Sequence, residues 1–516
     1  MTDQEIRATA LALKDAKTVT LSDLQSYLGK AADLLRGSID QADFKAFIFP
    51  LMFFKRISDV YLEEFAIALK ESGGDQEFAS FAENHRFQIP EGCLWDDVRS
   101  RTENVGQALI YAFREIEKAN PDTLYGIFGN SSWTNKQKIP DSVLIELVEH
   151  FSSKQLSNSA VTPDVFGDAY EYLIKRFADL SNKKAGEYYT PRSVVKLMVD
   201  ILDPQGGETV YDPACGTGGM LIEVIEHVKR AGGNPQLLWG KLFGQEKVLT
   251  TSGIARMNLL LHGIEDFKVV KEDTLRNPAF YHGDKLAQFD CVIANPPFSL
   301  ENWGEETWLA DRYGRNSIGG VPPKKNADWA WVQHMYASME AKSGRIAVVL
   351  PQGALTRGGA EGRIREAFLE RNLIECVIGM APNLFYGTNL APCIIILKAN
   401  KARAEDKNLL VIDAKLFFRR GRNQNTLEQE HISEIYKLYC ERKEVVGLTS
   451  IASIEEIKAN SYNLNISLYV SAIQNENNLT QAQSLINLTK SKKKTEISRL
   501  EVIAELENWI AYDNNK

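Results

Sequence analysis

The residues best suited to chemistry stand where a short apolar run ends. Phe289 to Ala294 is rich in β-forming residues and predicts a buried parallel strand. Asn295-Pro296-Pro297-Phe298 follows it directly. Proline cannot donate to a sheet ladder, and the residue before a proline avoids the helical region, so the strand ends in a stiff, extended turn. This turn presents an amide, a free carbonyl and an aromatic ring at a sheet edge, where open α/β sheets bind ligands.

The Asn-Pro-Pro-aromatic turn resembles the catalytic motif of methyltransferases that modify planar exocyclic or amide nitrogens. The amino nitrogen of adenine is a poor nucleophile because its lone pair is delocalised into the ring. Hydrogen-bond acceptors at Asn295 Oδ1 and the Pro296 carbonyl would pull this nitrogen towards tetrahedral geometry, and Phe298 would stack on an extruded base. An ordinary strand exit with an apolar anchor is the alternative that the four residues leave open.

A glycine-rich turn between a strand and a helix could hold a second reactant. The strand over 208–212 ends at Asp212, and a helix opens at Met220. Between them lie Pro213, Ala214, Cys215, Gly216, Thr217, Gly218 and Gly219. Glycines let a ligand approach the backbone and leave helix N–H groups pointing at it. Asp212 is placed to receive a cationic group, such as the amino end of a methionine moiety.

Two further predicted strands also end in acids. The strand over 241–246 ends at Glu246, which is placed to take both hydroxyls of a ribose. The element over 267–270 leads to Asp273, which could accept the amino group of an adenine in the cofactor. The recurrence of an acid at the end of three successive strands indicates a cofactor site more specifically than any one of these acids does.

The segment before the glycine-rich turn could form a pocket wall. A helix predicted over 164–180 leads to Gly186, Glu187, Tyr188, Tyr189, Thr190, Pro191 and Arg192. We expect Thr190 to cap the next helix, over 192–202, with Pro191 in its first turn. The alternative interpretation is a simple interdomain connector.

A long loop, 299–325, follows the Asn-Pro-Pro-Phe turn. Within or just beyond it lie four tryptophans and four cations: Trp303, Trp308, Trp329, Trp331, Arg312, Arg315, Lys324 and Lys325. Long loops in compact domains are usually functional or mobile. Aromatic residues among Arg and Lys suit a nucleic-acid strand with an extruded base, while tryptophans packed beneath the loop are the equally favoured alternative.

Length and composition set the frame. The 516 residues predict two or three domains, and the six cysteines lack a CxxC pair, which argues for a reducing cytoplasm and against structural zinc. The sequence has no apolar run long enough to span a membrane. It also has no residue spacing typical of metal ligands. The fold class is α/β, with a helical bundle over 1–165, a doubly wound sheet of about seven strands over 166–400 and a helical partner-docking region over 401–516. The strands over 373–378 and 393–397 should form an antiparallel hairpin at the sheet edge.

The order of these pieces resembles one family, the modification (HsdM) subunit of type I restriction-modification systems. The resemblance covers residues 20–400 and rests on the segments LRGSIDQADFKAFIFPLMFFKRISD (35–59), AYEYLIKRFAD (169–179), GEYYTPRSVVKLM (186–198), VYDPACGTGGML (210–221), NPPF (295–298), GRIAVVLPQGAL (344–355) and NLFYGTNLAPCIIIL (383–397). It implies an adenine-N6 DNA methyltransferase with a Rossmann-like fold that uses S-adenosylmethionine. The family usually has Gln where Glu187 stands.

The resemblance also implies roles for residues. The cofactor contacts are expected at Glu187–Arg192, at Thr217–Gly219 and at Glu246, with Asp273 as a further contact, and catalysis at Asn295 and Phe298. No covalent intermediate is implied, because the methyl group passes in line to nitrogen and catalysis is mainly positioning.

Partners follow from the same resemblance. A separate specificity subunit should choose the DNA site, with two copies of this chain for each specificity subunit, and a translocating nuclease subunit should join them. The formal charge of −8 fits a catalytic subunit that does not grip DNA alone. The alternatives are a stand-alone adenine DNA methyltransferase, an enzyme acting on RNA or on protein glutamine, and a structural subunit that only binds the cofactor.

Overall fold

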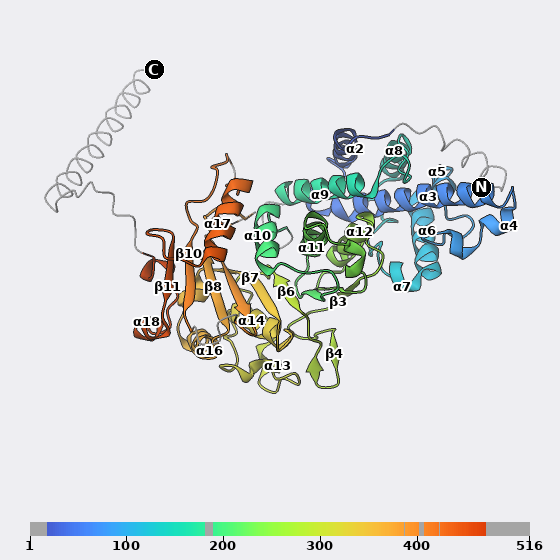
Figure 1. Ribbon diagram of the computed structural model, residues 1–516. Helices are drawn as coiled ribbons and strands as arrows, with labels where there is room; N and C mark the ends of the chain where they lie inside the picture. Colours follow the sequence, from blue (N-terminus) through green and yellow to red (C-terminus); the bar gives the residue numbers. More distant parts are fainter. Residues whose placement is uncertain (1–17, 181–188, 386–387, 402–406, 423, 471–516) are drawn as a thin grey trace, which may run out of the picture. The chain divides into compact units, whose positions relative to one another are not determined.

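The computed structural model describes residues 18–180, 189–385, 388–401, 407–422 and 424–470 (Figure 1). Residues 1–470 form one compact unit and residues 471–516 a second one, which lies outside the described residues. The basic run 490–494 and the amphipathic helix expected after it therefore also lie outside the described residues. In the described chain, no helix is both long and apolar enough to cross a membrane.

The first part of the chain is helical, as its apolar spacing predicts. Its longest helix, α3 (Lys45–Glu71), is buried along most of its length and continues through Pro50. Aromatic side chains fill the core around it, and the rings of Phe113 and Phe128 stack at 4.2 Å between centroids. The other helices here are α2 (Leu21–Leu34), α4 (Gln76–Ala79), α5 (Trp95–Arg99), α6 (Val105–Ala119), α7 (Pro121–Leu124), α8 (Asp141–Ser152) and α9 (Pro163–Leu180).

Helix α9 joins this helical part to the sheet. Its buried side chains Phe166, Tyr170 and Leu173 belong to the same apolar core as α3. The helix α12 (Leu249–Leu261), which follows the second strand of the sheet, contributes Ile254 and Met257 to that core as well. The helical part and the sheet therefore share packing along α9 and α12.

The remaining chain builds a nine-stranded sheet in the order β11-β10-β8-β9-β7-β6-β1-β2-β3. The strands are β1 (Val210–Asp212), β2 (Leu242–Glu246), β3 (Lys268–Lys271), β6 (Cys291–Ala294), β7 (Arg345–Pro351), β8 (Ile374–Gly379), β9 (Pro392–Lys398), β10 (Leu409–Asp413) and β11 (Thr449–Ala452). Neighbours from β3 to β7 are parallel, whereas β9 runs antiparallel to both β7 and β8. Strands β10 and β8 pair in parallel, and β11 closes the sheet antiparallel to β10.

All seven predicted strands are present, and β8 and β9 pair antiparallel as expected. Their expected place at the sheet edge is wrong, because β9 lies between β7 and β8, and β8 also pairs with β10. The expected division at residue 400 falls between β9 and β10 of this one sheet. The described residues of the C-terminal region thus supply two strands as well as helices. The first of these strands, 409–413, is fully buried, so it needs packing layers on both faces of the sheet.

Helices cover both faces of the sheet, as in a doubly wound fold (Figure 1). One face packs on α10 (Arg192–Leu202), α11 (Gly219–Arg230) and α17 (Gln429–Glu441). The other face packs on α14 (Asp328–Ala337), α16 (Gly359–Glu370) and α18 (Ile454–Ala459). Successive residues of β6 and β7 alternate between these two cores, so the central strands are buried on both sides.

The loop after the Asn-Pro-Pro-Phe turn is ordered by its own small core. It contains a short helix, α13 (Glu305–Trp308), and a 3-10 turn, η6 (Arg315–Ser317). The tryptophans at 303, 308, 329 and 331 are between 0 % and 6 % exposed. These four rings pack and are not available to a nucleic acid, so this part of the nucleic-acid interpretation is wrong. Their burial follows from their large apolar area, since their N–H groups find backbone acceptors in three of the four cases.

Candidate functional site

Asn295 lies at the centre of the sheet's carboxyl edge. It follows β6, which pairs with β1 on one side and β7 on the other. Its Nδ2 donates a hydrogen bond to Thr190 Oγ1 at 3.0 Å. Its Oδ1 is buried and has no hydrogen-bond partner in the described chain. A buried amide oxygen without a donor is costly, so this atom is an acceptor poised for an N–H group of a ligand.

Thr190 does not cap α10. The residue that precedes α10 is Pro191, and no side chain caps the helix. The Thr190 hydroxyl is used instead to orient the Asn295 amide, because an oxygen that accepts from Nδ2 fixes which end of the amide is Oδ1. Glu187 and Tyr188 lie outside the described residues.

The two prolines direct Phe298 towards a second aromatic ring. Pro296 is buried, and its carbonyl accepts no hydrogen bond from the residues that the structure describes. Phe298 is half-buried, with its ring centroid 6.1 Å from that of Phe385. Ser299 adopts a positive φ of 50°, and its N–H donates to Asp328 Oδ1 at 2.8 Å. The chain therefore turns sharply after Phe298, and the turn is held by a buried carboxylate.

The glycine-rich turn has the backbone geometry that its sequence predicts. Gly216 and Gly218 have φ of 53° and 80°, which other residues adopt only with strain, and Gly218 is the N-cap of α11. The turn is fixed from behind: the Thr217 carbonyl accepts from Asn258 Nδ2 at 2.9 Å, and the Cys215 N–H donates to the Gln245 carbonyl at 3.0 Å.

Two buried carboxyl groups border this turn. Asp212 is 2 % exposed, and burial raises its pKa to about 8, with the nearby Glu246 charge adding to the shift and the Ala214 N–H opposing it. Burial also raises the pKa of Glu246, against the N–H groups of Val248 and Gly216 that donate to it. Two repelling, desolvated carboxyls favour a cationic ligand, because a positive charge between them would stabilise both ionised forms.

Arg192 ties three elements together at the wall of the site. Its Nε donates to Glu171 on α9 at 2.5 Å, and its Nη1 donates to the Gly219 carbonyl at the start of α11 at 2.8 Å. Glu223 lies 3.6 Å from the same Nη1. The guanidinium thus clamps the helical part of the chain to the glycine-rich turn.

One cavity brings most of these groups together. Of the predicted site residues, those that line it are Tyr189, Thr190, Arg192, Asp212, Gly216, Thr217, Gly219 and Asn295. Glu246 borders it through a hydrogen bond from the Gly216 N–H to its Oε2 at 3.1 Å. Other described residues of the predicted site do not line the cavity, although they are close in sequence to residues that do. They are Pro191, Gly218 and Pro296–Phe298.

Asp273 does not face this cavity. Its carboxylate lies 2.9 Å from Lys247 Nζ and accepts from the Arg276 N–H at 3.3 Å. The sequence places an acid at the end of β3, but β3 is the outermost strand, and a neighbouring lysine takes the charge. Asp273 is therefore paired with Lys247 and is not among the residues that line the cavity.

Several lining residues were not singled out from the sequence: Glu171, Ile174, Val195 and Met220. Glu171 and Ile174 are one helical turn apart on α9, so one side of that helix faces the cavity. The sequence signal for Glu171 was weak, because at helical spacing it has charged neighbours, Asp168 and Lys175, as well as Ile174. Only the tertiary structure shows that this carboxylate is the partner of Arg192, the first residue of α10.

The arrangement can hold a cation beside an N–H donor. The carboxyls of Asp212 and Glu246 mark one end of the site, and the unpartnered Asn295 Oδ1 marks the other. An amino group bound at Asn295 would lie over the same cavity as a group bound at the glycine-rich turn. Such a site suits transfer between two reactants by positioning, without a nucleophilic side chain of the protein.

Comparisons with known proteins agree with this geometry. Residues 161–478 match the N-6 DNA Methylase family, and residues 24–151 match the HsdM N-terminal domain. The chain is 32% identical over 515 residues to the type I restriction enzyme MjaVII methylase subunit of Methanocaldococcus jannaschii, covering 96% of this chain and 86% of that one. It is also 32% identical over 410 residues to the HindI methylase subunit of Haemophilus influenzae, covering 77% and 89%.

A solved structure has the same fold. The type I restriction-modification system methyltransferase subunit from Streptococcus thermophilus is 31% identical, with a TM-score of 0.75 over 88% of this chain and 100% of that one. A modification subunit of a putative type I restriction enzyme from Vibrio vulnificus shares the fold at 23% identity and a TM-score of 0.62, covering 86% and 94%.

Proposed function

Because the chain belongs to the N-6 DNA methylase family and to the methyltransferase subunits of type I restriction-modification systems, we propose that its cavity holds S-adenosylmethionine beside a target adenine of DNA. The chain is an adenine-specific DNA methyltransferase subunit. The observation that carries the proposed site is the buried, unpartnered Asn295 Oδ1 at the wall of a cavity lined by Asp212 and the glycine-rich turn.

The residues present fit this cofactor. S-adenosylmethionine supplies an activated methyl group on a cationic sulfur, and it also carries a cationic amino end. Burial raises the pKa values of Asp212 and Glu246, and positive charges of this kind would stabilise the ionised forms of both carboxyls. We assign Asp212 to the amino end of the cofactor and Glu246 to its ribose hydroxyls. The Gly216–Gly219 backbone lets the cofactor approach closely. The contact expected of Asp273 would require its carboxylate to leave Lys247, so we place it outside this set.

Asn295 prepares the substrate nitrogen. Its Oδ1 accepts one amino hydrogen of the extruded adenine, and the Pro296 carbonyl accepts the other. Two acceptors draw the nitrogen out of conjugation, so its lone pair is directed at the methyl group. Thr190 keeps the amide in the orientation that this needs, and Phe298 stacks on the base. The N6 proton is released to solvent after transfer.

The partners follow as part of this proposal. A specificity subunit chooses the DNA sequence and associates with two copies of this chain, and a restriction subunit with nuclease and translocase activity joins the complex. The net charge of −8 supports a catalytic subunit that shares its grip on DNA. Five of the six cysteines are buried and all six are free, which supports a cytoplasmic location.

The test is a methyl-transfer assay on the tagged chain purified from its native host with whatever co-purifies. The substrate is unmethylated DNA, which is digested to nucleosides afterwards. N6-methyladenine that appears only with a co-purified second protein supports the proposal. N6-methyladenine from this chain alone would show that it recognises DNA by itself. Cofactor binding without any methylated nucleoside would direct attention to RNA or protein glutamine.

A further inference from the structure

An exposed arginine in the loop that follows the catalytic turn lies against two tyrosine rings. The Arg312 guanidinium carbon lies 5.6 Å from the Tyr281 ring centroid and 5.7 Å from that of Tyr313. The two rings are 5.6 Å apart, and Arg312 Nη2 donates to the Gly283 carbonyl at 2.9 Å. We call these three residues, Tyr281, Arg312 and Tyr313, the Tyr–Arg platform.

The platform rests on an anchored hairpin. Strands β4 (Tyr281–His282) and β5 (Lys285–Leu286) pair antiparallel around a turn at Gly283 and Asp284. The hairpin projects away from the central sheet (Figure 1). Leu286 is 6 % exposed, and the Phe280 ring packs edge-on against Tyr211 at 5.6 Å. The base of the hairpin is therefore fixed in the core, while Tyr281 remains 46 % exposed.

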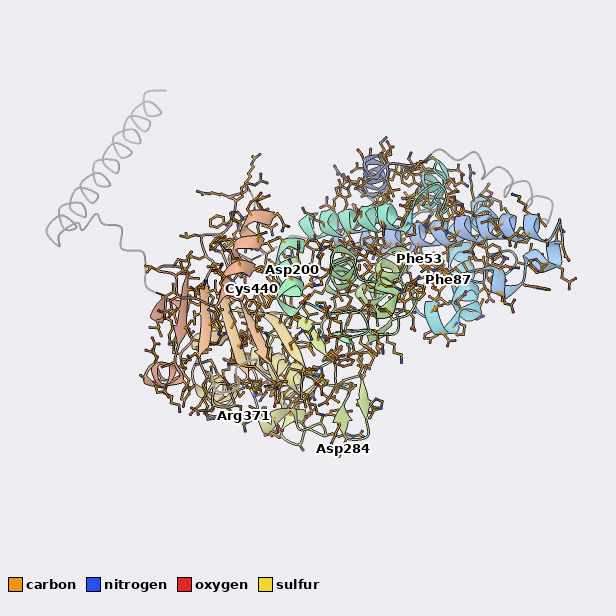
Figure 2. The ribbon with its side chains drawn as sticks, viewed as in Figure 1. Phe53, Phe87, Asp200, Asp284, Arg371 and Cys440 are labelled. Carbon is orange, nitrogen blue, oxygen red and sulfur yellow. The ribbon has the colours of Figure 1, made fainter. Side chains whose placement is uncertain are left out.

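Arg312 differs in its charge balance from three neighbouring cations, each of which pairs with a carboxylate. Arg276 pairs with Glu306 at 3.0 Å, and Arg315 pairs with Asp311 at 2.6 Å. Lys324 lies 3.6 Å from Glu305. Within the described chain, Arg312 pairs with no carboxylate, and this includes Asp284 in the hairpin turn, which Figure 2 labels. Its orientation comes from rings and a carbonyl, so its positive charge is left for an external anion.

The platform belongs to the catalytic edge of the sheet. The loop that carries Arg312 begins directly after Phe298 and is tied back to the segment following β3. Arg315 Nη1 donates to the Thr274 carbonyl at 3.3 Å, and Trp308 Nε1 donates to the Leu275 carbonyl at 2.9 Å. Thr274 in turn donates to the Pro213 carbonyl at 2.6 Å, next to the glycine-rich turn.

We propose that the Tyr–Arg platform binds a backbone phosphate of the DNA duplex that flanks the target adenine. This inference rests on the proposed function. A planar guanidinium offers several N–H donors to phosphate oxygens, and among the residues that the structure describes only one donor of Arg312 is used. The rings hold the guanidinium in place, so little side-chain freedom is lost on binding. The contact positions the duplex without reading its sequence.

The experiment compares Arg312→Gln with a matched control in the complex of this chain with its specificity subunit. The control is Arg371→Gln. Arg371, which Figure 2 labels, is exposed and donates to the Ala367 carbonyl at 3.0 Å. It precedes β8 and so lies at the amino ends of the parallel strands, whereas Asn295 lies at their carboxyl ends. DNA affinity is measured by fluorescence anisotropy between about 50 and about 200 mM salt, with cognate and unrelated duplexes.

We expect Arg312→Gln to weaken both duplexes about tenfold at low salt, and to reduce the slope of log affinity against log salt by about 0.9 for each copy of the chain. Arg312→Lys should recover part of the affinity, because it keeps the charge without the planar fork. Arg371→Gln should leave affinity and slope unchanged. Cofactor affinity, measured by calorimetry, should be the same in all variants.

Three outcomes overturn the inference. Unchanged affinity and slope in Arg312→Gln would remove the phosphate contact. An equal effect of Arg371→Gln would show a general effect of net charge. Loss of complex assembly at every salt concentration would assign the platform to the specificity subunit instead of DNA. Failure of the proposed function is distinguishable, because it would appear as absence of N6-methyladenine from the wild-type complex.

Discussion

The Asn295 amide is oriented by Thr190, whose Oγ1 accepts from Nδ2 at 3.0 Å and leaves Oδ1 buried without a donor. Thr190 stands just before α10 and Asn295 directly after β6. The two residues are 105 positions apart in the chain. The bond joins the segment before α10 to the Asn-Pro-Pro-Phe turn. Under the proposed function, it decides which atom of the amide faces the substrate.

Thr190→Val should lower kcat for methyl transfer while leaving the cofactor KM within about threefold. Without the hydroxyl, the amide can rotate and present Nδ2 to the substrate amino group, and misorientation of this kind costs on the order of 100-fold in rate. Thr190→Ser is the matched control, because it keeps the acceptor and should retain most of the activity. Steady-state kinetics with labelled cofactor measure both constants. Equal losses in the two variants would argue against orientation by the hydroxyl.

Asn295→Ala should abolish methyl transfer and retain cofactor binding. Removing one preorganised hydrogen-bonding group from a reacting centre commonly costs about 100- to 1,000-fold in kcat. The cofactor contacts assigned above do not involve Asn295, so calorimetry should give a dissociation constant close to that of the wild-type chain. Retained activity would remove the catalytic role given to this residue.

Asp212→Asn should stabilise the chain without cofactor at alkaline pH and weaken cofactor binding. The pKa of Asp212 is raised to about 8 in the folded state, against about 4 in an unfolded chain. The folded state therefore holds more protons between these values, and the free energy of unfolding falls as pH rises through this window. Thermal melts at pH 5 and at pH 9 should show a smaller decline for Asp212→Asn. An identical pH dependence would exclude Asp212 as the source.

Glu246→Gln should weaken S-adenosylmethionine binding by about tenfold, because it exchanges a charged acceptor for a neutral one at the ribose hydroxyls. The N–H groups of Gly216 and Val248 donate to Oε2 and Oε1 of the carboxylate, so the substitution keeps an acceptor for only one of them. Glu246→Ala should weaken binding further, since it also frees the glycine-rich turn. Calorimetry that finds unchanged affinity in both variants would remove the ribose assignment.

Phe298→Ala should slow methylation of a fully paired duplex more than methylation of a duplex with a mismatched target adenine. Stacking of a base on an aromatic side chain contributes about 1–3 kcal/mol, and a mismatched base costs less to extrude. Phe298→Tyr keeps the ring and serves as the control. Equal losses on both substrates would indicate that Phe298 acts only through its packing with Phe385.

The sequence alone determined the local chemistry and its order along the chain. Strand ends followed by acids, a glycine-rich turn and the stiff Asn-Pro-Pro-Phe exit depend on short-range backbone preferences, which are legible in one dimension. The seven predicted strands are all present. Strands buried on both faces, such as β6 and β7, need near-continuous apolar sequence, whereas the edge strand β3 is mostly exposed. The resemblance to a known family extended this to the cofactor and the reaction.

Only the tertiary structure decided which of these groups meet. The strand order puts β6 beside β1 and puts β3 at the edge, which brings Asn295 to the cavity and leaves Asp273 with Lys247. Glu171 of α9 and Arg192 at the start of α10 become partners, although they are far apart in the sequence. Trp303, Trp308 and Trp331 become part of one small core, and Trp329 packs in the core that covers one face of the sheet. Such pairings depend on contacts between distant segments, and a residue's spacing along the chain does not contain them.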